Sequence, residues 1–130
     1  MNNVTNAKIS IVVIDDSDFT RKNLVHFLKS KNYNVTADFN HARPALEYLA
    51  ANNTQIALVD VVMPEISGIE LTQKISQNLG RTKVIMMSSL AQERIILEAI
   101  AAGAQDFLQK PINELHLDDS IQRIAHAESA

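Results

Sequence analysis

Polar side chains that could do chemistry stand at or just beyond the ends of four apolar runs in this chain. They are Asp15 and Asp16, Asp60, Ser88 and Lys110. If the runs are parallel strands of one sheet, these side chains meet at its carboxyl edge, where open α/β sheets place their ligand sites. Buried charge is unfavourable unless it is paired or holds a metal ion. The grouping therefore predicts a chemical site and not a packing layer.

The elements that must position these residues follow from hydrophobic periodicity. Strand-like runs at 9–14, 34–38, 56–59, 84–87 and 104–108 alternate with segments of helical period. Asp16 or Ser17 could cap the first helix, and Asn113 the last. Gly80 is placed as a C′ glycine after the third helix, and a fourth helix is expected over 91–102, stopped by Gly103. We predict five strands alternating with five helices.

Such alternation implies right-handed crossovers and a parallel sheet covered on both faces. Periodicity does not give the strand order, but five strands favour the flavodoxin-like doubly wound order 2-1-3-4-5. We find no linker, repeat or low-complexity segment in the 130 residues, so we expect one α/β domain.

Composition narrows the function classes. Twelve Lys and Arg against fifteen Asp and Glu give a net charge of -3 without a basic block, so we expect no direct nucleic-acid binding. The absence of cysteine rules out disulfides and suits a reducing cytosol, so we expect a cytoplasmic protein. There is no signal-peptide pattern, and no run approaches the ~18 apolar residues of a membrane span. We expect a soluble, unprocessed chain.

Each polar residue alone has an ordinary structural explanation. Asp15 and Asp16 could form a solvated turn with a helix cap, Asp60 could simply end a strand, Ser88 could be an N-cap, and Lys110 a surface lysine beside a turn proline. Their joint occurrence at the ends of four different strands favours one shared site instead.

Taken together, these motifs resemble the receiver domain of bacterial two-component response regulators, in the single-domain arrangement of chemotaxis regulators. The resemblance runs through the acidic pair, Asp60 with the Met-Pro dipeptide at 63–64, Ser88 and Lys110-Pro111, which lie 22 residues apart in sequence, and Phe107. It implies a receiver domain over residues 8–127, preceded by an N-terminal extension over 1–7.

The resemblance implies that Asp60 is the phosphoacceptor, which takes a phosphoryl group from a phosphohistidine. It also implies a Mg2+ ion bound by Asp16, Asp60 and the backbone carbonyl of Val62, with Asp15 acting through a water. Lys110 would supply charge to the phosphoryl group and to Asp60. The family's peptide bond before the proline at 111 is usually cis. The implied role is that of a regulatory phosphoacceptor, which assists its own phosphotransfer and slow dephosphorylation, and not of an enzyme.

Ser88 and Phe107 resemble the family's switch pair. The hydroxyl moves to the phosphoryl group and the ring swings into the vacated space, which shifts the population of a partner-binding surface. The chain departs from the commonest pattern at Ser89, where alanine is frequent. It also has apolar Val62 and Leu90 at the positions flanking the phosphoryl group. Since apolar neighbours orient water poorly, we hypothesise slow self-hydrolysis tuned by Val62 and Leu90.

The expected partners are a sensor histidine kinase or histidine phosphotransfer protein, and a downstream protein target or output domain, with homodimerisation as a further option. A partner surface is predicted on the fourth helix at Ala91, Ile95, Glu98 and Ala102. A wide core-facing arc is an equally good explanation of that helix's apolar residues.

Three other functions were weighed. A flavodoxin-like cofactor binder is disfavoured because the acidic first loop would repel a phosphate. A haloacid-dehalogenase-type phosphatase needs a general acid where this chain has Val62. A receiver that acts as a phosphorylation-independent interaction module remains the serious alternative.

Overall fold

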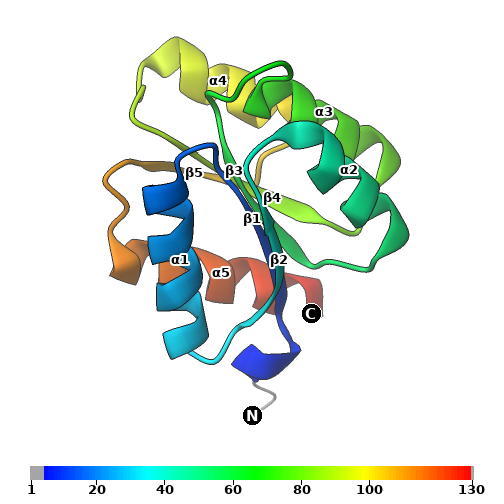
Figure 1. The fold of residues 1–130 in the computed structure, drawn as a ribbon, viewed down its shortest axis with the longest axis vertical. Coiled ribbons are helices and arrows are strands. Elements are labelled where there is room, and N and C mark those ends of the chain that lie inside the picture. The colour runs from blue at the N-terminus through cyan, green and yellow to red at the C-terminus, as the bar shows by residue number, and fades with distance from the viewer. Residues whose placement is uncertain (1–4, 130) are drawn as a thin grey trace.

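A parallel sheet with helices on both faces makes up the computed structural model, which describes residues 5–129 (Figure 1). A 3-10 turn, η1 (Asn6–Lys8), precedes the sheet. The strands are β1 (Ser10–Ile14), β2 (Asn34–Phe39), β3 (Ile56–Asp60), β4 (Lys83–Ser88) and β5 (Asp106–Gln109). The helices are α1 (Asp18–Ser30), α2 (Ala42–Ala51), α3 (Gly68–Asn78), α4 (Glu93–Ala102) and α5 (Glu114–Ser129).

The sheet has the order β2-β1-β3-β4-β5, and every neighbouring pair is parallel. This confirms the predicted flavodoxin-like topology. Helices α1 and α5 cover one face, and α2, α3 and α4 cover the other (Figure 1). The chain's order in the sheet brings the carboxyl ends of β1 and β3 side by side, which is the point where doubly wound sheets bind ligands.

Side-chain alternation along the strands builds two separate cores. In β1, Ile11 and Val13 pack with the α1 and α5 face, while Val12 and Ile14 pack with the α2 to α4 face. All five residues of β3 are buried. Burial on both faces explains why the central strands read as unbroken apolar runs in the sequence.

Most predicted caps are confirmed. The Ser17 hydroxyl accepts a hydrogen bond from the Thr20 N–H at 3.2 Å, so Ser17 and not Asp16 caps α1. Asn113 accepts from the His116 N–H at 3.0 Å and caps α5. Gly103 ends α4 with a left-handed φ of 111°. Gly80 follows the C-cap residue of α3 as expected but does not have a positive φ.

Two predicted boundaries were wrong by two residues. Helix α4 begins at Glu93 and not at 91, and β5 spans Asp106–Gln109 and not 104–108. The Ala104 N–H donates to the Ala99 carbonyl at 3.0 Å, so this residue still belongs to the turn that closes α4. Pairing with β4 begins only at Asp106, opposite Ile85.

The expected N-terminal extension is only partly described, since residues 1–4 lie outside the described part of the chain. Asn6 is tied to the domain: its amide donates to the Lys31 carbonyl at 2.7 Å and accepts from Gln122 at 2.8 Å. The predicted boundary at residue 8 stays a prediction. Among residues 5–129, none of the helices has the length and apolar character needed to cross a bilayer.

Candidate functional site at the carboxyl edge of the sheet

The backbone aligns the ends of the central strands with one another. Ile14 pairs with Val59, and Asp60 pairs with Met87. The Lys110 N–H donates to the Ser88 carbonyl at 2.9 Å, which extends the β4–β5 pairing beyond β5. The polar residues predicted from the sequence therefore lie at or just beyond four neighbouring strand ends of one sheet.

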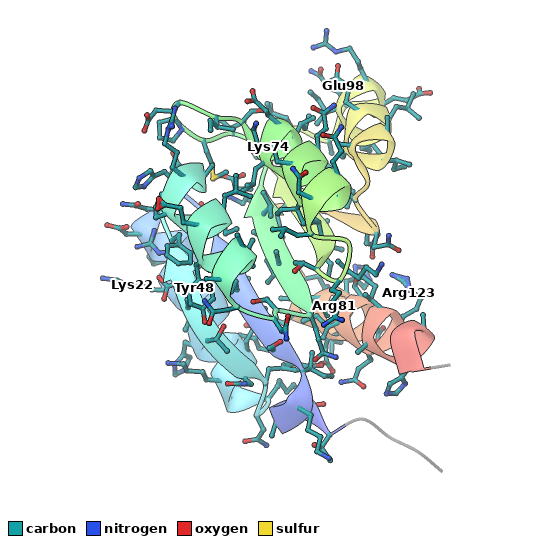
Figure 2. All side chains as sticks on the ribbon, turned by 90° about the vertical axis from the view of Figure 1, so that its right-hand side faces the viewer. Lys22, Tyr48, Lys74, Arg81, Glu98 and Arg123 are labelled. Atoms are coloured by element: carbon teal, nitrogen blue, oxygen red, sulfur yellow. The ribbon has the colours of Figure 1, made fainter. Side chains whose placement is uncertain are left out.

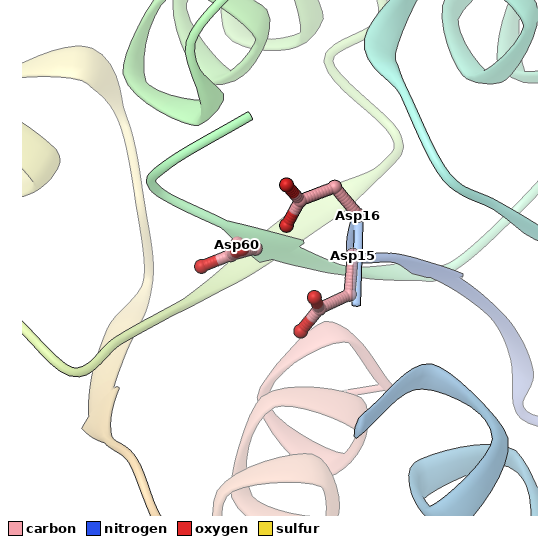
Figure 3. Close-up of side chains that lie close together, drawn as sticks. All are labelled: Asp15, Asp16 and Asp60. Carbon is pink, nitrogen blue, oxygen red and sulfur yellow. The ribbon is translucent and has the colours of Figure 1, made fainter. Parts of the chain in front are cut away.

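Three carboxylates gather at this edge (Figure 3). Each of Asp15, Asp16 and Asp60 offers an oxygen that lies within 4.8 Å of the others, and no other such group of acidic, His or Cys side chains occurs in the described chain. Asp15 and Asp60 are buried, whereas Asp16 is exposed. The structure thus brings together the acidic residues that were predicted to meet.

Asp15 is fully buried and both of its carboxylate oxygens have protein donors. One accepts from the Ser17 N–H at 2.9 Å, and the other accepts from Lys110 Nζ at 2.7 Å. Among the residues that the structure describes, no donor engages the Asp16 carboxylate. Asp15 is therefore held in place by the protein, while Asp16 faces solvent and is available to a ligand.

The surroundings of Asp60 change the pKa of its carboxyl group. Burial, followed by the negative charge of Asp15, raises its pKa to about 6. The nearby Lys110 ammonium, 3.4 Å from Asp60 Oδ1, opposes this rise. A buried carboxylate next to two others is unfavourable unless a cation joins it, so the arrangement suits the binding of a positive ion or group.

Lys110 pairs more closely with Asp15 than with Asp60. Burial disfavours its charged form, but the hydrogen bond to Asp15 and the charges of Asp60 and Asp15 outweigh burial and raise the pKa of Lys110. Its ammonium remains charged and compensates part of the acidic cluster. The peptide bond between Lys110 and Pro111 is cis, as the resemblance implied.

The donor set fits a hard divalent cation. Magnesium binds oxygens at about 2.1 Å, so opposite ligands of its octahedron lie about 4.2 Å apart. Carboxylate oxygens within 4.8 Å of one another can reach such an ion with small adjustments. Only oxygen donors are present, which suits magnesium and not a metal that prefers nitrogen or sulfur.

Gly68 fixes how the loop after β3 returns to α3. A Cβ at this position would lie 1.9 Å from the carbonyl oxygen of Asp60, so only glycine fits. The Gly68 N–H donates to the Val61 carbonyl at 2.8 Å. This contact closes the loop that carries Val62, which is 54% exposed.

Ser88 and Phe107, the predicted switch residues, lie in neighbouring strands. Ser88 is buried and its hydroxyl oxygen accepts from the Leu90 N–H at 2.9 Å, while Ser89 is exposed. Phe107 is half-buried, opposite Met86 in the sheet, and packs against the core on the α2 to α4 face. Leu90 is 44% exposed.

The predicted partner surface on α4 needs a correction. Ala102 is buried at 4% exposure and cannot present its side chain to a partner. Ala91 and Ile95 are half-buried, and Ile95 packs against the core, whereas Glu98 is exposed on the outside of α4 (Figure 2). The exposed large apolar side chains of this helix are Leu97 and Ile100, each 57% exposed.

Sequence reasoning missed Arg21. This arginine lies on the same stripe of α1 as the buried Leu24 and Leu28, and is itself only 9% exposed. A charged residue at a core-facing position of an amphipathic helix indicates a buried partner, and that signal was present in the sequence.

The fold and the site define an open α/β domain with an acidic cluster that could hold a metal ion at the carboxyl ends of its central strands. The chain belongs to the response regulator receiver domain family, whose sequence model matches residues 11–122. This membership supports phosphorylation-dependent signalling as its general role. Receiver domains interact with kinases and with downstream targets.

Individual relatives agree with this assignment. The chain is 28% identical over 115 residues to the chemotaxis protein CheY of Thermotoga maritima, covering 88% of this chain and 96% of that protein. It is 28% identical over 113 residues to the CheY of Bacillus subtilis, covering 87% and 94%. A crystal structure of a CheX–CheY–BeF3–Mg2+ complex from Borrelia burgdorferi has the same fold, with a TM-score of 0.84, 24% identity, and coverage of 89% and 88%.

Proposed function

We propose that this chain is a signalling switch in which Asp60 accepts a phosphoryl group from a phosphohistidine of a sensor kinase or a histidine phosphotransfer protein. The observation that carries the proposal is the position of Asp60. It is buried at the end of β3, next to two other carboxylates and 3.4 Å from the Lys110 ammonium. Its chemistry follows from that position.

The transfer is a displacement at phosphorus. A carboxylate oxygen of Asp60 attacks the phosphorus, the P–N bond to the donor imidazole breaks, and its electron pair stays on the ring nitrogen. The product is an acyl phosphate on Asp60 and a neutral histidine on the donor. Lys110 stabilises the phosphoryl oxygens as negative charge develops on them.

Asp16, Asp60 and the Val62 carbonyl are the oxygens that we assign to Mg2+, with Asp15 acting through a water. A bound magnesium would neutralise the repulsion between the carboxylate and the phosphoryl oxygens. The assignment is supported by the hydrogen bonds of Asp15, since both its oxygens are occupied by Ser17 and Lys110. Asp16 has no such donor and remains open to direct coordination.

Ser88 and Phe107 are the residues that we assign to the conformational response. The Ser88 oxygen already accepts from Leu90, so its O–H remains as a donor for a phosphoryl oxygen. A shift of Ser88 toward the phosphoryl group would open space beside β5. Phe107 is half-buried in the adjacent strand and could fill that space.

The surface that reports this change would include Ala91, just before α4, and Ile95 and the exposed Glu98 of α4. The exposed Leu97 and Ile100 support a contact at this helix, since apolar side chains of this size gain from being covered. The partner is a downstream target protein, an output domain or a second copy of the chain. The expected cytoplasmic location stays a prediction.

Mass spectrometry after incubation with acetyl phosphate and Mg2+ tests the phosphoacceptor. We expect a gain of one phosphoryl group that Asp60→Asn abolishes. The exposed Asp119→Asn on α5 is the matched control and should retain the gain. A wild-type chain that gains no mass, while still binding partners, would instead support a phosphorylation-independent interaction module.

The phosphoryl lifetime is the second testable part. Val62 and Leu90 are exposed, and neither can orient a hydrolytic water. The double variant Val62→Asn with Leu90→Glu should lose the phosphoryl group several times faster than the wild type, followed by intact mass over time. Leu115→Asn, which alters an exposed apolar residue of α5, is the control. Equal half-lives would show that these two residues do not set the lifetime.

A further inference from the structure

Arg21 connects three separate parts of the chain through one guanidinium group. Its Nη1 donates to the Asp15 carbonyl oxygen at 2.8 Å, and its Nε donates to Asp38 Oδ1 at 2.9 Å. Its Nη2 donates to Asp18 Oδ1 at 2.6 Å. The Arg21 side chain is only 11% exposed and its bond to the Asp15 carbonyl is buried, whereas the side chains of Asp18 and Asp38 are 71% and 43% exposed.

The loop between β1 and α1 is the part that this contact restrains. The Asp15 carbonyl belongs to the peptide that joins Asp15 to Asp16, and Arg21 holds it directly. On the other side of Asp16, the Ser17 N–H is bonded to the Asp15 carboxylate at 2.9 Å. The backbone of Asp16 therefore lies between two fixed peptides, although its side chain is exposed.

The planar guanidinium group of Arg21 is required to make these three hydrogen bonds at once. A guanidinium presents several N–H donors in fixed directions, whereas a lysine ammonium is a single point of charge. Asp18 and Asp38 accept hydrogen bonds from Nη2 and Nε of the guanidinium and support its positive charge. Lysine would keep that charge but could not reach three acceptors in these directions.

We infer that Arg21 is a positioning residue that orders the loop bearing Asp15 and Asp16 and thereby sets the affinity of the site for Mg2+. The inference rests on the proposed function, because it concerns the same ion. Residues that orient metal ligands without touching the metal typically change affinity by about 10- to 100-fold when they are replaced.

Substitution by glutamine separates positioning from simple charge. Arg21→Gln removes a positive charge near the carboxylates, and charge alone would strengthen cation binding. Loss of the ordered position of the Asp15–Asp16 loop would instead weaken Mg2+ binding. We expect Arg21→Gln and Arg21→Lys both to bind Mg2+ about tenfold more weakly, measured by NMR titration of backbone amides under conditions where each variant is folded.

A second measurement tests how well the loop between β1 and α1 is ordered in the absence of metal. In a chelator, the amide of Ser17 should exchange its hydrogen several times faster in Arg21→Lys than in the wild type. Ile121→Val, which trims a fully buried residue of α5, controls for general destabilisation and should alter neither readout. If the Arg21 variants fold poorly, Asp38→Ala, which removes one anchor of the guanidinium, should weaken Mg2+ binding in the same direction by a smaller factor.

The outcomes distinguish this inference from the proposed function. A wild-type chain that binds no Mg2+ overturns the proposed function and the affinity role of Arg21 with it. Normal Mg2+ binding by the wild type together with equal or tighter binding by Arg21→Gln overturns the inference alone. Unchanged exchange at Ser17 in Arg21→Lys also overturns it, whatever the metal does.

Discussion

Asp60 is a carboxylate that the fold holds where its charge is unfavourable. Its pKa of about 6 lies above the ordinary value of 3.8, so the native state binds this proton more tightly than the unfolded chain does. Its contribution to the free energy of unfolding is fully present below pH 3.8 and is lost as the pH rises through 6. Near neutral pH, the charged Asp60 therefore destabilises the protein.

Asp60→Asn should remove that penalty. In a chelator at pH 7.5, we expect the free energy of unfolding to rise by about 2–3 kcal/mol, because a pKa difference of one is worth about 1.4 kcal/mol. At about pH 4 the two proteins should differ little. Urea denaturation at both pH values measures this, with the exposed Asp119→Asn as control. An equal gain at both pH values would mean that the effect does not come from ionisation.

At the residue scale, the sequence was sufficient to find the side chains but not their pairing. Asp15, Asp60 and Lys110 were predicted because each follows a strand, and strand ends converge in a parallel sheet. That Lys110 lies closer to Asp15 than to Asp60 depends on side-chain packing between residues 95 apart in the chain. Arg21 was missed because its three acceptors come together only once the loop has folded.

At the element scale, the turn from β3 into α3 depends on a residue without a side chain. A Cβ at Gly68 would overlap the Asp60 carbonyl oxygen at 1.9 Å, so Gly68→Ala must push α3 away from Asp60. We expect a loss of at least 2 kcal/mol in the free energy of unfolding, as for other overpacked sites, and weaker Mg2+ binding. Urea denaturation and amide NMR titration measure the two effects.

Gly80→Ala is the matched control for that prediction. Nothing lies within 4 Å of a Cβ at Gly80, and its φ is not positive, so alanine fits there. We expect this variant to be neutral or slightly more stable, because alanine restricts the unfolded chain. If both glycine variants change the free energy of unfolding by the same amount, the close approach of Gly68 to the Asp60 carbonyl does not affect stability.

Element boundaries show what periodicity can and cannot predict. Apolar spacing predicted the existence and type of the five strands and five helices, because most of them bury a regular face; β5, in which no residue is fully buried, is an exception. The apolar pattern placed Ala104 in β5, because Ala104 lies three residues before the apolar pair Phe107-Leu108 and was taken into the same strand. The structure assigns Ala104 to the turn after α4 through its hydrogen bond to Ala99, a contact that the hydrophobic pattern does not encode.

At the scale of the whole molecule, the two cores and the acidic edge have opposite effects on the stability of the folded domain. The cores bury the central strands from both sides and hold β1 and β3 together. That same pairing forces three carboxylates within 4.8 Å of one another, so the sheet is stabilised by packing while its edge is destabilised by repulsion. From the sequence, only the number of strands favoured the order 2-1-3-4-5. Hydrophobic periodicity does not show which strands are neighbours in the sheet.

A divalent ion should relieve this repulsion and stabilise the entire domain. A ligand that binds only the native state adds about 2.7 kcal/mol at a concentration one hundred times its Kd. We therefore expect Mg2+ to raise the midpoint of thermal unfolding by roughly 10 °C over a chelated sample at equal ionic strength. Asp16→Asn should lose most of this rise, because it removes a proposed direct ligand, while Asp119→Asn should keep it. Identical melting with and without Mg2+ would mean that the acidic edge is balanced by Lys110 alone and needs no ion.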